Sequence, residues 1–148
     1  MNSTRIELSL QATAEAPRLV RRALDEWPAL QEPELRFLLR LLVTDLVTNA
    51  VRHAGLDPDD RVEVVIAAEH DVVSVRVTDH GSGGPRLPAQ ASFERDSGRG
   101  LLLVTAIADR WNVQSRGGTT VLFELDCEPS GWPRHFDAAL RRAAESIV

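Results

Sequence analysis

Residues 37–54, FLLRLLVTDLVTNAVRHA, decide how the rest of the chain is interpreted. Their apolar residues recur at intervals of three and four, which predicts a long amphipathic helix with a broad apolar face. Asp45, Asn49 and His53 are spaced four residues apart, so their side chains form one polar stripe along that helix. A carboxylate, an amide and an imidazole in a row are typical of a binding or catalytic site. A polar helix edge satisfied by hydrogen bonds is the alternative.

The composition argues against several classes of protein. The chain has 148 residues, of which 43% are hydrophobic and 26% charged, as in an ordinary globular domain. A net charge of -5 argues against a protein that binds nucleic acid directly by neutralising phosphates. All 17 basic residues are arginine, which excludes a P-loop lysine or a Schiff-base lysine, and the single Cys127 excludes an intrachain disulfide. Because no signal-like or membrane-spanning run is visible, we expect a cytoplasmic protein with no membrane contact.

Alternating apolar and polar residues predict strands with one dry face. The predicted strands are 5–10, 61–67, 72–78, 111–115 and 119–125, with hairpins at 69–71 and 117–118. Further helices are predicted at 14–27 and 101–109. We therefore expect an α+β fold, a two-layer α/β sandwich in which helices cover one face of a mixed, mostly antiparallel sheet. Residues 1–126 would form the domain, and 127–148 a C-terminal extension with a helix over 133–147.

Two groups of glycines border the polar segment 85–97. Gly81 and Gly83 follow a predicted strand, and Gly98 and Gly100 open a predicted helix. Glycines before a helix let the backbone approach a phosphate, whose charge then meets free amides and the positive end of the helix dipole. Turns without a ligand are the alternative. The segment between the glycines has no periodicity, so we expect a mobile loop there.

Asp79 ends the strand that precedes the first glycines. A carboxylate fixed at that position, beside bare backbone, can accept hydrogen bonds from an amino group of a ligand such as adenine. An Asx turn that caps the loop is the alternative.

The order of these motifs resembles one superfamily. The helix contains LLVTDLVTNAVRHA, a strand ends in DHGSG, the next helix begins with GRGLLLVTAIADRWNV, and GGTT precedes the last strand. This arrangement is similar to the Bergerat-type (GHKL) ATP-binding fold of DNA gyrase, Hsp-type chaperones, sensor histidine kinases and mismatch-repair ATPases. Within it, the two longer motifs most resemble the small anti-sigma factor serine/threonine kinases of actinobacteria. The resemblance covers residues 5–126.

The resemblance implies ATP and Mg²⁺ as cofactors and assigns the site residues. Asn49 would coordinate the Mg²⁺ that bridges the ATP phosphates, and Asp79 would bind the adenine amino group. Asp45 stands where the family has its catalytic base. The other residues that would contact ATP are Gly81 and Gly83 beside the base, Gly98, Arg99, Gly100 and Leu101 beside the phosphates, and Thr120 beside adenine. Residues 85–97 would form the ATP lid.

Two positions depart from the family pattern. The family's base is usually glutamate, whereas Asp45 is one methylene shorter, and Thr119 stands where a lysine is common. A base must reach the hydroxyl proton, so a misplacement of about 1 Å can slow phosphoryl transfer on the order of 100-fold. ATP binding should change little. His53 is either a residue that orients the site or, more commonly for such a histidine, a packed or capping residue.

Two functions remain open at this point. The first is an anti-sigma factor and protein serine/threonine kinase that phosphorylates an anti-sigma factor antagonist in a partner-switching system. Its partners would be that antagonist and a sigma factor, and members of the family commonly form homodimers. The second is a catalytically weak ATP-sensing binder that sequesters a sigma factor or another regulator. A sensor histidine kinase domain is less favoured, because we expect no dimerisation helix pair and no phosphoacceptor helix.

Overall fold

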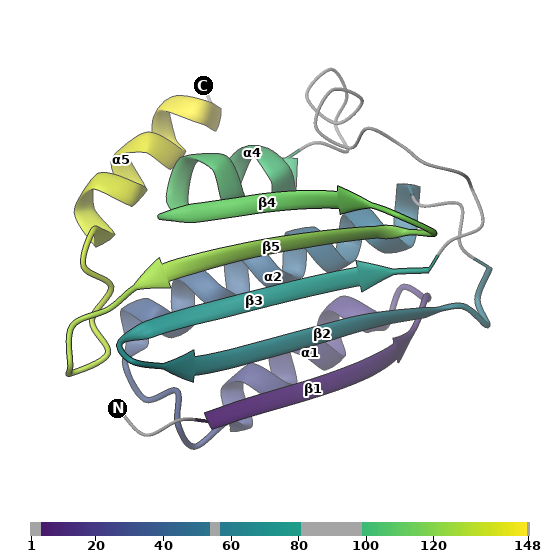
Figure 1. Cartoon of the computed structure of the whole chain (residues 1–148), viewed down its shortest axis with the longest axis horizontal. Coiled ribbons are helices and arrows are strands. Elements are labelled where there is room, and N and C mark those ends of the chain that lie inside the picture. The colour runs from purple at the N-terminus through teal and green to yellow at the C-terminus, as the bar shows by residue number, and fades with distance from the viewer. Residues whose placement is uncertain (1–3, 54–56, 81–98, 148) are drawn as a thin grey trace.

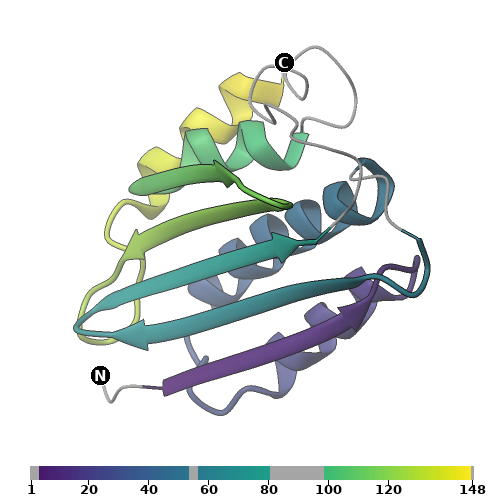
Figure 2. The ribbon, with the colours of Figure 1, turned by 45° about the vertical axis from the view of Figure 1, so that its right-hand side comes forward.

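The computed structural model describes residues 4–53, 57–80 and 99–147. They form two layers, with α1, α2 and α4 on one face of a single sheet (Figures 1 and 2). The strands are β1 (Thr4–Gln11), β2 (Arg61–Glu69), β3 (Val72–Asp79), β4 (Arg110–Ser115) and β5 (Thr119–Asp126). The helices are α1 (Ala16–Glu26), α2 (Pro33–His53), α4 (Arg99–Ile107) and α5 (Phe136–Ile147). The expected α+β fold is confirmed.

Two hairpins, β2 to β3 and β4 to β5, are joined with β1 into one sheet. Its order is β1-β2-β3-β5-β4, and each neighbouring pair is antiparallel. The sheet that we expected to be mixed is therefore antiparallel throughout the described chain. Val77 lies opposite Val64 on one side and Val121 on the other, so these apolar side chains share the helix-covered face.

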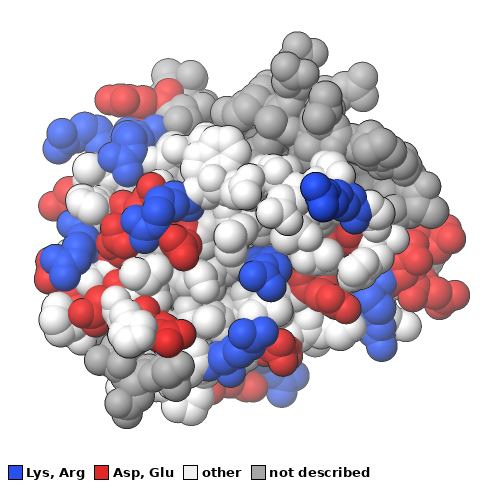
Figure 3. Space-filling model, in the orientation of Figure 1, with Lys and Arg blue, Asp and Glu red and all other residues white. Residues whose placement is uncertain are grey.

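The opposite face of the sheet is not covered by any described helix. Arg76 lies on this face, between its cross-strand partners Val65 and Leu122. Figure 3 shows acidic and basic side chains interspersed across the face, with uncharged surface between them. The alternation that predicted one dry and one wet side of each strand is thus confirmed.

Helix α2 supplies a large part of the core. It begins at Pro33, four residues before the predicted start, because proline fits the first helical turn, where the amides have no intrahelical partner. Its fully or almost fully buried residues are Leu35, Leu38, Leu39, Leu42, Val43, Leu46 and Val47. Burial of each such side chain contributes about 1.5–3 kcal/mol. Helix α2 packs between α1 and α4 and against β2 and β3.

The segment after β5 packs against the same two-layer domain. Cys127 pairs with Pro133 in an isolated bridge, and α5 begins at Phe136 rather than at the predicted residue 133. Helix α5 lies against α4, where the Nε of Arg142 donates a hydrogen bond to the carbonyl of Ala106, in the last turn of α4. No helix in the described ranges is both long and apolar enough to cross a membrane.

Both hairpins turn through left-handed backbone. In the turn from β2 to β3, His70 has φ 51° and Asp71 has φ 62°. Two central residues with positive φ are typical of a tight type I′ turn, for which asparagine and glycine are preferred. The turn from β4 to β5 places Gly117 at φ 62° and Gly118 at φ 140°. The chain therefore uses glycine in one turn and accepts strain in the other.

We predict that Asp71→Gly stabilises the protein. The substitution removes the steric cost of a left-handed aspartate, about 1 kcal/mol, and keeps the backbone carbonyl that accepts the 2.8 Å hydrogen bond from the amide of Cys127. The midpoint of thermal unfolding should rise by about 2–4 °C. Glu69→Gly is the matched control, because Glu69 ends a strand and lacks a positive φ, so it should lower the midpoint. Equal losses in both variants would contradict the prediction.

Candidate functional site

Four element ends lie at the same end of the molecule. They are the last turns of α2, the end of β3, the start of β5 and the first turn of α4 (Figures 1 and 2). These ends carry Asn49, Asp79, Thr119 and Arg99, which are far apart in the sequence. The topology thus gathers the described parts of the predicted site in one region.

Asp79 is held tightly at the end of β3. It is a charged residue that is only 8% exposed, and it lies opposite Val62 and Thr119 on the helix-covered face. A Cβ at Gly118 would lie 2.1 Å from the carbonyl oxygen of Asp79, so only glycine allows the β5 hairpin to approach this closely. The close approach fixes the backbone that carries the carboxylate.

The strand register places two neighbouring threonines on opposite faces of the sheet. Thr120 pairs with Thr78, and their hydroxyl oxygens lie 3.1 Å apart on the open face of the sheet. Thr119 is the residue opposite Asp79 on the helix-covered face. Sequence reasoning chose Thr120 and counted Thr119 only as a departure from the family. Since successive side chains of a strand point to opposite faces, the register relative to Asp79 identifies Thr119 as the better candidate for a contact with a ligand held there.

The polar stripe of α2 is present. Asp45 and Asn49 are half-buried, as are Thr44 and Thr48 beside them, whereas the intervening apolar residues are buried. Asp45 precedes Asn49 by one helical turn, which is about 6 Å along the axis. The backbone of His53 ends α2, and its side chain lies outside the described part.

The glycine motifs are described only in part. Gly81, Gly83, Gly98 and the predicted lid 85–97 lie outside the described residues. Arg99, Gly100 and Leu101 form the first turn of α4, where backbone amides have no intrahelical acceptor and suit an anion. Their contact with phosphates stays a prediction.

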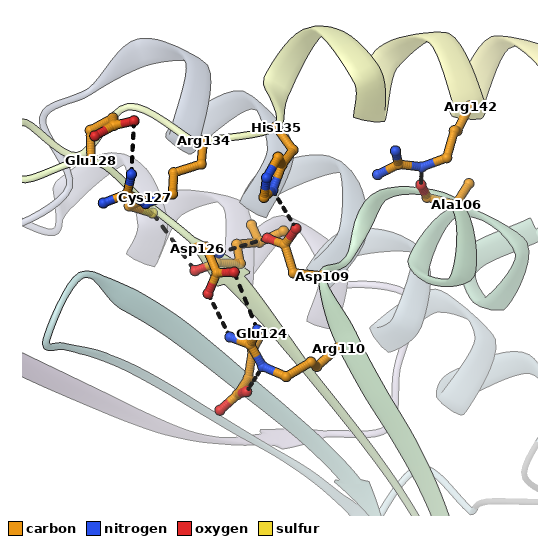
Figure 4. Close-up of polar contacts among 11 residues, drawn as sticks. Ala106, Asp109, Arg110, Glu124, Asp126, Cys127, Glu128, Arg134, His135 and Arg142 are labelled. Atoms are coloured by element: carbon orange, nitrogen blue, oxygen red, sulfur yellow. Dashed lines mark hydrogen bonds and ion pairs between the residues drawn. The ribbon is translucent and has the colours of Figure 1, made fainter.

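A second polar cluster, which sequence reasoning missed, lies at the other end of β5 (Figure 4). Asp109 accepts hydrogen bonds from His135 at 2.7 Å and from the backbone amide of Asp126 at 2.7 Å. Asp126 in turn forms a double ion pair with Arg110, which also reaches Glu124 at 2.6 Å. The hydrogen bond from Arg110 lowers the pKa of Asp126.

The cluster of Asp109, Arg110, Asp126 and His135 is best explained as a structural clamp, that is, a set of contacts that holds neighbouring segments of the chain together. The oxygens of Asp109, Asp126 and the ring of His135 lie within 4.8 Å of one another, a spacing that a metal site requires. Both oxygens of Asp126 already pair with the guanidinium of Arg110, however, so a cation would have to displace that arginine. The contacts instead join β4, β5 and the segment that leads into α5. No local sequence pattern connects these residues, because they meet only through tertiary packing.

Cys127 is a buried free thiol. Burial raises the pKa of its thiol to about 12, so the thiolate that a nucleophile or a metal ligand requires does not form near neutral pH.

Comparisons with known proteins identify a family for this chain. The family described as the histidine kinase-like ATPase domain matches residues 10–125. An uncharacterised protein of Streptomyces coelicolor is 35% identical over 92 residues, which are 62% of this chain and 84% of that protein. The sensor-type histidine kinase PrrB of Mycobacterium leprae is 36% identical over 106 residues, which cover 65% of this chain but only 21% of the kinase.

The fold also occurs in a solved structure. The crystal structure of the RsbU and RsbW domains of Rv1364c from Mycobacterium tuberculosis matches with a TM-score of 0.63 and 22% identity, over 87% of this chain and 34% of that one. At this identity the match shows the fold alone. The family match spans well over half of the sequence and includes every described site residue, and the chain therefore belongs to the histidine kinase-like ATPase domain family.

Proposed function

We propose that this chain binds ATP with Mg²⁺ and transfers the γ-phosphate to a serine or threonine of an anti-sigma factor antagonist. Family membership supports ATP binding. The observation that carries the kinase activity is the position of Asp45, one helical turn before Asn49 on the partly exposed side of α2. A carboxylate so placed can act as the base for a hydroxyl presented beside the metal-bound phosphates.

Each described residue has one role in this proposal. The amide oxygen of Asn49 would hold Mg²⁺, which takes oxygen ligands and neutralises charge on the phosphates. Asp79 would accept a hydrogen bond from the adenine amino group, and Thr119, rather than Thr120, would assist it. In the transfer, the substrate oxygen bonds to the γ-phosphorus, the bond from phosphorus to the ADP oxygen breaks, and the hydroxyl proton passes to Asp45.

Asp45 also supports a second candidate function of the chain. Asp45 is shorter than glutamate by one methylene, which withdraws its oxygen from a substrate hydroxyl by about 1.5 Å. A chain that binds ATP but transfers phosphate slowly or not at all would act as an ATP-sensing binder that sequesters a sigma factor or another regulator. Phosphotransfer at saturating ATP distinguishes the two functions.

The adenine role is tested by Asp79→Asn. The change keeps the shape of the side chain but replaces an acceptor oxygen with a donor, which costs about 1–3 kcal/mol in a buried contact. ATP affinity measured by calorimetry should fall roughly ten- to hundredfold. Asp71→Asn makes the same charge change in the distant turn from β2 to β3 and should leave the affinity unchanged. Wild-type affinity in Asp79→Asn would rule out the adenine contact.

A pair of glycine variants tests how the site is positioned. Gly118→Ala forces the end of β3 away, because its Cβ would lie 2.1 Å from the carbonyl oxygen of Asp79. ATP affinity should fall by about tenfold or more. Gly117→Ala also strains a backbone with positive φ, but a Cβ at Gly117 would have no atom within 4 Å, so this variant should lower the unfolding temperature and leave ATP affinity within about twofold. Equal ATP affinities in the two variants would show that the close approach does not position Asp79.

The catalytic role is tested at Asp45. We expect slow phosphorylation of the antagonist by the wild type, faster transfer by Asp45→Glu and none by Asp45→Asn, with similar ATP affinity in all three. The measurement is transfer of labelled phosphate from saturating ATP. Equal rates in the wild type and Asp45→Asn would show that Asp45 is not the base. Absence of transfer in both the wild type and Asp45→Glu would favour the ATP-sensing binder.

A further inference from the structure

A groove with a volume of about 510 Å³ lies between α1 and α2. Asp45 lies among its lining residues, and the remainder of the lining plays no part in the proposed ATP site. The apolar part of the lining includes Phe37 and Leu41, on successive turns of α2. Phe37 is 48% exposed, which is unusual for a large aromatic side chain on a helix that otherwise builds the core. The groove therefore offers an apolar anchor point beside the expected base.

Arginines surround this apolar part. Arg21 of α1 and Arg36 and Arg40 of α2 line the groove, whereas Asp45 is its one carboxylate. The lining thus carries three positive charges and one negative charge, although the chain as a whole has a net charge of -5. Such a lining favours a ligand that carries carboxylates, which arginine binds well through its several donors.

Part of the donor capacity in the groove is unused. Arg40 forms an ion pair with Asp25 at 3.0 Å, but Arg21 has no hydrogen bond or ion pair within the described chain. The Nε of Arg36 and the hydroxyl of Thr44 are buried and have no partner among the described residues. Because these two donors are buried, the partly exposed Arg21 supplies the donors that a ligand in the groove can reach without rearrangement of the lining.

The groove leads toward the expected site of phosphoryl transfer. Phe37, Leu41 and Asp45 follow one another at four-residue intervals, and Asn49 continues the series. From Phe37 to Asp45 the helix advances by about 12 Å. About four residues of an extended chain span that distance. A segment anchored at Phe37 would therefore place a residue about four positions away beside Asp45.

We propose that this groove docks an acidic segment of the protein partner, in which an apolar side chain is flanked by carboxylates about four residues from the phosphorylated serine or threonine. The part that concerns phosphorylation rests on the proposed function, whereas the docking of the acidic segment can be tested by itself. The apolar side chain would pack on Phe37 and Leu41, and the carboxylates would pair with Arg21 and Arg36.

The test uses two fluorescein-labelled peptides and fluorescence anisotropy. In the first, a leucine flanked by glutamates lies four residues from a serine, and in the second, lysines replace the glutamates. The acidic peptide should bind at least about tenfold more tightly than the basic one. Arg21→Glu and Phe37→Ser should each weaken this binding about tenfold or more, with ATP affinity unchanged.

Matched control variants distinguish the loss of contacts in the groove from general effects of net charge or exposed apolar area. Arg22→Glu changes the net charge as Arg21→Glu does, but Arg22 pairs with Glu26 and does not line the groove. Leu19→Ser removes an apolar side chain that is 41% exposed outside the groove. Neither control should weaken binding of the acidic peptide.

Several results would overturn the proposal. They are no binding of the acidic peptide, equal binding of the two peptides, and equal losses in the groove and control variants. If Phe37→Ser converts a dimer of the chain alone into a monomer in sedimentation, the groove is an interface between two copies, which also overturns it. A chain that binds the acidic peptide as expected but transfers no phosphate to any substrate would overturn the kinase function and leave the docking groove in place.

Discussion

The structure depends on the packing of α2 against the helix-covered face of the sheet. One side of this helix is buried between α1, α4 and the strands, and it carries more buried apolar residues than any other element of the described chain. Because the buried side is fixed, the orientation of the other side is fixed too. Asp45 and Asn49 therefore take their positions from hydrophobic packing that involves neither of them.

The sheet positions the second half of the site by a different constraint. Asp79 is placed by backbone pairing of β3 with β2 and β5 and by the close approach of Gly118. Helix packing thus positions Asp45 and Asn49, and strand pairing positions Asp79, in the candidate site. The 22% identity with a solved chain of the same fold shows that the fold itself accepts wide sequence variation.

The elements of the fold could be predicted from the sequence because the apolar residues of each element recur at a regular interval. The alternation of valines in β2 and β3, and the spacing of leucines in α2, were sufficient to find those elements within a few residues. The predicted start of α2 was four residues late, because its regular apolar spacing becomes clear only at Phe37 and Pro33 occupies the first turn. The purely antiparallel order could not be predicted, because strand pairing across the α4 crossover is not encoded in any local pattern.

The site was less predictable than the fold. The sequence pointed to Asp79 and to a threonine near Gly118, but choosing between Thr119 and Thr120 requires the register, since one residue of shift exchanges the two faces. The clamp of Asp109, Arg110 and His135 and the groove between α1 and α2 were beyond prediction. Both arise where segments that are separate in the sequence come together in the folded chain.

The burial of Cys127 has a practical consequence for work on this protein. Its thiol is enclosed and, with a pKa of about 12, remains protonated near neutral pH, so thiol-directed reagents should not modify the native chain. A cysteine introduced on the exposed surface would then be the single reactive position. Spectroscopic probes can thus be attached one at a time at exposed positions without first removing the natural cysteine from the core.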